Sequence, residues 1–192
     1  MFGFVLTMEN AIWLFPAIRQ IRGRYAPYFL VLGISGLLEI ILLRAHSLRY
    51  INLLCVFASS LLVYFLIETD AIRKVRYVSI AFLILVSCGI NQFCHGRPEI
   101  AISVLLRTAI LGIFVKRLIT ETAIKHSFNI FTAFLILYEL SIVLRFFFAI
   151  TETQVGYFYF YTSMIFESML GIFFFIFTEE SRGMMVKIGK PE

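Results

Sequence analysis

Long apolar runs separated by short basic clusters set the pattern of this chain. The clearest run extends from Phe128 to Ile150 and contains 23 residues. At about 1.5 Å rise per residue, a helix of that length crosses the roughly 30 Å hydrocarbon core of a bilayer. Runs of this kind predict membrane-spanning helices rather than the core of a soluble domain.

We predict seven such spans. The first is the shortest and contains Glu9, Asn10 and Pro16. Its proline removes a backbone hydrogen bond and should kink that helix. The prediction is therefore an all-α integral membrane protein, a seven-transmembrane-helix bundle in which residues 1–192 form one polytopic domain. The predicted spans are Phe4–Ile18, Ala26–Leu43, Ile51–Ile67, Val78–Gln92, Glu99–Val115, Phe128–Ile150 and Val155–Phe177.

The connections between spans carry unequal basic charge. Those after the first, third, fifth and seventh spans hold twelve Lys and Arg residues, whereas the opposite side holds Arg44, Arg49 and Arg97. Cytoplasmic connections are enriched in Lys and Arg, so the N-terminus is expected outside and the C-terminus in the cytoplasm. If the first segment only lies in the interface, the other six spans keep this orientation.

Composition agrees with a membrane protein. Apolar residues make up 60% of the chain and charged residues 15%, which excludes a disordered chain. The net charge of +5 belongs to the connections, so we expect contact with lipid headgroups and none with nucleic acid. The chain has no Asn-x-Ser/Thr glycosylation site, which fits our expectation of a bacterial inner membrane.

Two segments suggest an internal repeat. Val56–Asp70 and Ile165–Glu179 align without a gap, with six of fifteen positions identical. Spans one to three and five to seven would then be two parallel three-helix repeats, joined by an inverting fourth helix. The alternative is an accidental match between segments of similar apolar composition.

Charged residues inside the spans are the main chemical candidates. A charge at the bilayer centre costs about 2.5–3.5 kcal/mol, so it normally faces protein or water. We expect a polar cavity open to the outside, with Glu139 and Glu167 near mid-membrane. The alternatives are structural ion pairs between helices and side chains that extend to the headgroups. Glu9 is also intramembrane, and the ligand- or proton-binding candidates are Glu39, Arg107, Glu139, Arg145 and Glu167.

Helical spacing relates some of these residues. Ser163, Glu167 and Gly171 recur at i, i+4 and form one small, polar stripe. Arg145 lies roughly 120° around its helix from Glu139, at about 100° per residue. A pair within that helix is therefore poor, and Arg145 should find a carboxylate on another helix, with Glu39 and Glu167 as the expected partners.

Other chemistry finds little support. The histidines fall outside the spans and no metal-ligand pattern occurs, so we expect no metal and no cofactor. The motifs of hydrolases, nucleotide-binding enzymes and deaminases are missing, so we expect no enzymatic activity. The cysteines fit small buried core residues, with a disulfide to Cys55 as the alternative. They are Cys55, Cys88 and Cys94, and the histidines are His46, His95 and His126.

One short stretch resembles a known family. Phe15–Arg22, at the end of the first span, resembles the proline motif of PQ-loop and SWEET-type sugar carriers, which have a three-plus-one-plus-three layout. Ala17 replaces the motif glutamine, and span five has no matching Pro-Gln. The likeness covers eight residues and the layout, and we assign no family from it.

The leading hypothesis is a carrier or binding protein for a small polar or anionic solute. Glu139 or Glu167 would couple protons, and Arg107 or Arg145 would contact an anion. The alternatives are an accessory subunit of a larger membrane complex, a homo-oligomer included, and a membrane sensor that signals through a partner. A carrier predicts intramembrane charges that converge inside the bundle, whereas a subunit predicts charges that face outward.

Overall fold

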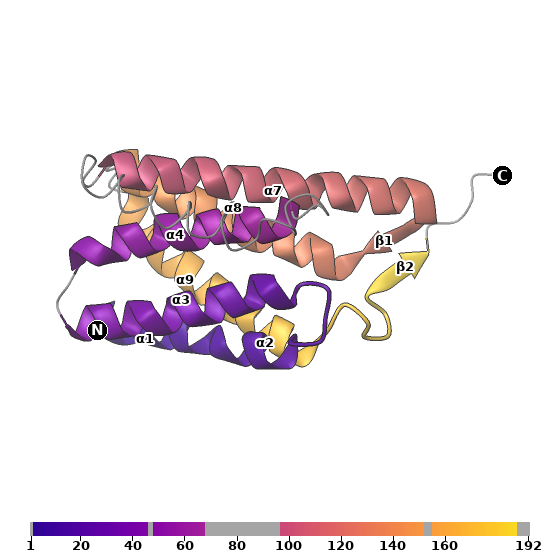
Figure 1. The fold of residues 1–192 in the computed structure, drawn as a ribbon, viewed down its shortest axis with the longest axis horizontal. Coiled ribbons are helices and arrows are strands. Elements are labelled where there is room, and N and C mark those ends of the chain that lie inside the picture. Colours follow the sequence, from indigo (N-terminus) through magenta and orange to yellow (C-terminus); the bar gives the residue numbers. More distant parts are fainter. Residues whose placement is uncertain (1, 46–47, 68–96, 152–154, 188–192) are drawn as a thin grey trace, which may run out of the picture.

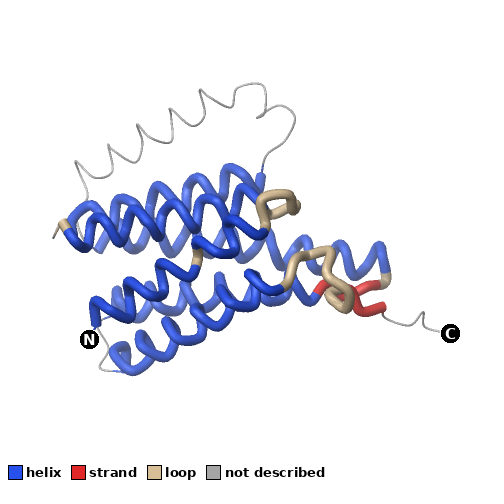
Figure 2. Tube along the Cα trace, turned by 90° about the horizontal axis from the view of Figure 1, so that it is seen from below, coloured by secondary structure: helices blue, strands red, loops and turns tan. Residues whose placement is uncertain are grey.

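Helices packed side by side form a closed ring in the described part of the chain (Figures 1 and 2). The computed structural model describes residues 2–45, 48–67, 97–151 and 155–187. The segment α1–α2 contacts α3, and α4, α7, α8 and α9 follow in ring order until α9 returns to α1 and α2. The elements are α1 (Phe2–Ile12), α2 (Leu14–Arg19), α3 (Ala26–Arg44), α4 (Leu48–Ile67), α7 (Arg97–Lys125), β1 (Ser127–Asn129), α8 (Ile130–Thr151), α9 (Val155–Ile176) and β2 (Met185–Lys187).

Five of the described helices are long and apolar enough to cross a membrane. This finding confirms the predicted helical, multi-pass membrane architecture. The fourth predicted span, Val78–Gln92, lies outside the described residues, so the count of seven stays a prediction. The five candidate spans are Ala26–Arg44, Tyr50–Ile67, Pro98–Lys125, Ile130–Thr151 and Phe158–Ile176.

The N-terminal segment is a broken helix that packs between α3 and α9 in the ring. Its helical pattern is interrupted at Trp13, between α1 and α2. Pro16 has no N–H for the carbonyl of Ile12, and its ring crowds that carbonyl, so the break falls just before the proline. The predicted effect of Pro16 is thus confirmed.

Glycines allow this segment to approach its neighbours closely. A Cβ atom on Gly36 of α3 would lie 2.8 Å from the backbone oxygen of Asn10. A Cβ atom on Gly171 of α9 would lie 2.5 Å from Cγ2 of Ile12. Both distances are shorter than real contacts, so α1 fits between α3 and α9 only because these positions lack a side chain.

A small sheet closes one end of the bundle, and the sequence did not predict it. Strands β1 and β2 are antiparallel, with Phe128 opposite Val186. Asn129 accepts a hydrogen bond from the backbone N–H of Thr132 at 3.1 Å through Oδ1. This N-cap explains why α8 begins at Ile130 and not at Phe128 as predicted. We call this end of the bundle the sheet end and the opposite end the far end (Figure 1).

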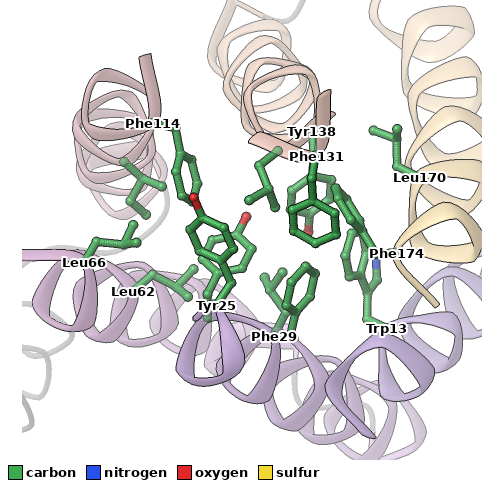
Figure 3. Close-up of a cluster of buried hydrophobic side chains, with 14 of the residues drawn as sticks. Trp13, Tyr25, Phe29, Leu62, Leu66, Phe114, Phe131, Tyr138, Leu170 and Phe174 are labelled. Atoms are coloured by element: carbon green, nitrogen blue, oxygen red, sulfur yellow. The ribbon is translucent and has the colours of Figure 1, made fainter. Parts of the chain in front are cut away.

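An aromatic cluster fills the ring towards the sheet end (Figure 3). The rings of Phe131 and Phe174 lie 5.1 Å apart, and Phe29 and Phe174 lie 5.2 Å apart, between centroids. Helices α3 and α8 begin at the sheet end, and α7 and α9 approach it at their C-terminal ends (Figure 1). We call the six rings that meet there the aromatic plug: Tyr25, Tyr28, Phe29, Phe114, Phe131 and Phe174.

Candidate functional site

An ion pair between α7 and α8 lies at the centre of the bundle. Arg107 Nη1 donates to both carboxylate oxygens of Glu139, at 3.0 and 3.3 Å. Arg107 Nε donates to Ser59 Oγ of α4 at 3.1 Å, and the hydroxyl of Tyr28 from α3 donates to Glu139 Oε1. Glu139 is fully buried and Arg107 is 7% exposed. One buried network therefore joins four helices and reaches the aromatic plug through Tyr28.

A second arginine bridges two carboxylates. Arg145 Nη1 lies 2.8 Å from Glu9 Oε1 of α1, and Nη2 lies 3.0 Å from Glu167 Oε2 of α9. Ser141 Oγ donates to Glu167 Oε1 at 3.0 Å. The guanidinium also lies over the ring of Phe160, 5.5 Å from its centroid, a cation–π distance. One carboxylate from α1 and one from α9 thus share the single positive charge of Arg145 on α8.

A cavity of about 70 Å³ adjoins both arginines. At roughly 30 Å³ per water molecule, this volume holds about two waters. Glu39 of α3 reaches the cavity and is partly buried. Trp13 and Tyr138 form part of the wall, with their ring centroids 4.3 Å apart, where the cavity meets the aromatic core. The polar residues of the wall are Glu9, Asn10, Ser35, Glu39, Cys55, Arg107, Tyr138 and Arg145.

The charges around this cavity do not balance. We use the name polar cluster for six residues that carry a formal charge of −2 when all are ionised. Two carboxylates about 4 Å apart repel by roughly 4 kcal/mol at an effective dielectric constant of about 20. The cluster therefore favours added positive charge, as a proton or a cation. Its members are Glu9, Glu39, Arg107, Glu139, Arg145 and Glu167.

One of the two excess negative charges lies at Arg145, and the other is on Glu39. Glu139 has Arg107 and Tyr28 as donors, so this pair is neutral and well hydrogen-bonded. Glu9 and Glu167 must divide the donors of one guanidinium. Glu9 Oε2 is buried and accepts no hydrogen bond from a donor in the described part of the chain. Glu167 Oε2 has the ion contact with Arg145 Nη2 at 3.0 Å, without the geometry of a hydrogen bond.

The structure brings all five predicted site residues together. Arg107 and Glu139 form a pair, Arg145 and Glu167 form another, and Glu39 lies on the cavity that both arginines line. The predicted partner of Arg145 on another helix is confirmed for Glu167. Whether these residues bind a ligand or a proton stays a prediction.

Other participants were not among the predicted site residues. Glu9 is 3% exposed and shares Arg145, and its position inside an apolar run was the available signal. Tyr28 and Ser59 bind the Arg107–Glu139 pair. No sequence pattern marks either of them, because an interhelical contact by a tyrosine or serine depends on how the helices rotate.

Metal chemistry finds no support among the described residues, where no group of three or more His, Cys, Asp or Glu could hold a metal ion. Cys55 is a free thiol that lines the cavity. The disulfide alternative requires Cys88 or Cys94, and both lie outside the described residues. His46 and His95 lie outside them as well.

The sheet end carries a different polar group. Arg24 Nη1 contacts Oε1 of Glu121 at 2.5 Å and Oε1 of Glu179 at 3.7 Å. Burial raises the pKa of the Glu179 carboxyl, against the lowering effect of Arg24. Gln20 Nε2 donates to the carbonyls of Phe174 and Phe177 at 2.8 and 2.7 Å. These bonds satisfy carbonyls that have no partner within the helix at the end of α9, and they join α2 to α9.

Comparison with family models, curated proteins and solved structures finds no match for this chain.

Proposed function

We propose that this protein is a non-enzymatic carrier or binding protein for a small polar solute. The solute would enter from the far end of the bundle and reach the cavity beside Glu39. The aromatic plug would block its passage towards the sheet end in this conformation. The observation that carries the proposal is a polar cavity placed directly against a packed aromatic layer. Glu9 and Glu39 line this cavity, beside two arginines that already pair with carboxylates.

Proton coupling is assigned to Glu167. The sequence left Glu139 and Glu167 as alternatives, and their surroundings favour the second. Glu139 has one arginine to itself and a tyrosine donor, so its charge is compensated. Glu167 shares Arg145 with Glu9, so one proton on this pair would neutralise the group formed by these three residues.

An anionic solute has less support than a neutral or cationic one. Both guanidiniums that could contact an anion already bind carboxylates, so an anion would have to displace Glu139 from Arg107, or Glu9 or Glu167 from Arg145. An anion would also add to a cluster that already has a formal charge of −2. The anion contacts of Arg107 and Arg145 stay predictions that this charge balance disfavours.

The accessory-subunit alternative predicted charges that face outward onto a partner. Glu9, Arg107, Glu139 and Glu167 instead face the interior and are at most 7% exposed. Their convergence supports the carrier. A sensor that binds the same solute remains the second candidate, because it needs the same cavity and no uptake.

We extend the proposal to a seven-span layout in a bacterial inner membrane, with the N-terminus outside. The basic residues of the connections support this orientation, which makes the sheet end cytoplasmic. The ring order supports the predicted repeat, because α1–α2, α3 and α4 occupy one half and α7, α8 and α9 follow in the other. In that scheme Glu39 and Glu139 lie on equivalent helices.

Solute-driven proton movement tests this proposal. Liposomes containing the full chain and a trapped pH-sensitive dye would receive, in turn, sodium, methylammonium, lactate and glucose. We expect at least one solute to change the internal pH, and Glu167→Gln to abolish that change. Glu121→Gln, at the sheet end, is the matched control and should behave as the unmodified protein. Absence of a response to every solute, or an unchanged response in Glu167→Gln, would contradict the proposal.

A further inference from the structure

The cavity has acceptors that no described donor uses. Glu9 is 3% exposed and lines the cavity, yet its Oε2 accepts no hydrogen bond from a described donor. Glu39 lines the same space. Arg107 and Arg145 are both in ion pairs, whereas Glu39 makes none with the described residues. The wall therefore presents two carboxylates to one small volume, beside the paired guanidiniums of Arg107 and Arg145.

Neutral oxygens complete this wall. Ser35 Oγ donates to the carbonyl of Leu32 at 3.0 Å, which leaves its lone pairs available to the cavity. Asn10 adds a buried carboxamide from α1. Carboxylate, hydroxyl and amide oxygens are the ligands of hard cations, and they also accept hydrogen bonds from ammonium groups.

We propose that this cavity binds one small monovalent cation, of the size of Na⁺ or an ammonium ion. Glu39 and Glu9 would supply the charge, and Ser35 and Asn10 the neutral oxygens. This inference rests on the proposed function and names the class of its solute. With one proton on Glu9 and Glu167, a single +1 ion removes the remaining formal charge of the polar cluster.

Size and ligand count narrow the class. A cavity of about 70 Å³ is too small for a sugar or for a cation with several carbon atoms. Mg²⁺ keeps several of its waters and Ca²⁺ takes about 6–8 oxygen ligands, which needs more room than this cavity has. The described residues also contain no group of three or more acidic, His or Cys side chains suited to a metal ion. Arg107 is paired with Glu139, and Arg145 with Glu167 and Glu9. A cation in the cavity would therefore share the Glu9 carboxylate with Arg145 and have Glu39 to itself.

Trp13 makes binding directly observable. It is the only tryptophan in the chain, and it lines the cavity. The purified full chain in detergent would be titrated at neutral pH with sodium or methylammonium chloride, which replaces choline chloride at constant ionic strength. Choline is too large for the cavity and serves as the inert ion. Equilibrium dialysis with radiolabelled Na⁺ gives a second readout that does not depend on fluorescence.

We expect saturable binding of Na⁺ or methylammonium, and a dissociation constant at least about tenfold higher in Glu39→Gln. Ser35→Ala should weaken binding less, and Glu121→Gln, at the sheet end, should leave it unchanged. Glu39 makes no ion pair in the described structure, so its substitution should not prevent folding.

Two results would overturn the inference. One is the absence of saturable binding by both readouts, with Trp13 emission that responds to pH alone; this outcome leaves the proton-coupled carrier intact. The other is equal binding in the unmodified protein and in Glu39→Gln. Binding without uptake into liposomes would support the inference and contradict the carrier, which leaves a cation-binding sensor.

Discussion

The two halves of this bundle are built from the same helices but from different chemistry. Towards the sheet end, the aromatic plug packs six rings with no charge among them. In the middle and towards the far end, the polar cluster contains six charged side chains. Four of them line the cavity, and Glu139 and Glu167 pair with its arginines. The half at the sheet end is uncharged and held by ring packing, whereas the polar cluster in the other half has a formal charge of −2 when all its members are ionised.

The two halves should therefore respond differently to pH and to small ions. Aromatic packing does not depend on pH or on small ions, so the stability that the plug contributes should not change with either. A cluster with excess carboxylates changes its charge with pH and with bound cations. A membrane protein that senses or moves a small ion needs both, because a responsive site requires a fixed wall behind it.

The largest effect is expected from breaking the central ion pair. Glu139→Leu leaves Arg107 buried without its carboxylate, and should lower the free energy of unfolding by about 3–5 kcal/mol. The double variant Glu139→Leu/Arg107→Leu should recover most of this loss, since it removes both charges. Thermal unfolding in detergent measures the three proteins. A double variant no more stable than the single one would show that the pair matters for more than charge.

Truncation within the aromatic plug should cost somewhat less. Phe131→Ala removes a fully buried ring that contacts Phe29 and Phe174. Packing is lost, but lipid is as apolar as the core, so we expect about 2–3 kcal/mol rather than the 3–5 kcal/mol of a water-soluble protein. The loss should be equal at acidic and neutral pH. A loss of stability that differs between acidic and neutral pH would contradict the proposed difference between the two halves.

The fit of α1 against α3 gives the next effect. Gly36→Ala places a Cβ atom against the backbone oxygen of Asn10 and should destabilise the fold by about 1–2 kcal/mol. Gly112→Ala is the matched control, because a Cβ atom there meets nothing within 4 Å. Since Asn10 lines the cavity, Gly36→Ala should also alter Trp13 fluorescence. Equal stability of the two variants would contradict the close contact.

The smallest effect concerns pH at the sheet end. Burial raises the pKa of Glu179, so the folded state binds this proton more tightly than the unfolded state. The free energy of unfolding should therefore fall as pH rises from the ordinary glutamate value of about 4.3 to the raised one. Arg24 opposes the effect of burial on this carboxyl, so we expect less than about 1 kcal/mol. Glu179→Gln should flatten this slope, and unfolding across that pH range tests it.

Much of the architecture was predictable from apolar periodicity. The spans beginning at Ala26 and Val155 start where their helices do, and Pro16 marks the break in the first. Helix α7 continues to Lys125, ten residues past its predicted end. Hydropathy locates the part of a helix inside lipid and says nothing about its extension beyond the bilayer.

The sequence identified most of the residues of the candidate site, but it did not identify all of the ion pairs between them. Charge inside a span identified Glu39, Arg107, Glu139, Arg145 and Glu167, and helix geometry paired Arg145 with another helix. The choice of Glu9 as its second partner depends on the close approach of α1, which Gly36 and Gly171 permit. Such contacts follow from the rotation and separation of helices, which a single sequence does not specify.

The central claim is that a proton on the Glu9–Glu167 pair neutralises the excess negative charge around Arg145. Infrared difference spectroscopy of the reconstituted protein observes this proton directly, through the carbonyl stretch of a protonated carboxyl. We predict such a band at neutral pH, lost in Glu167→Gln and retained in Glu121→Gln. A spectrum with no protonated carboxyl at neutral pH, or with a band unaffected by Glu167→Gln, would contradict the account.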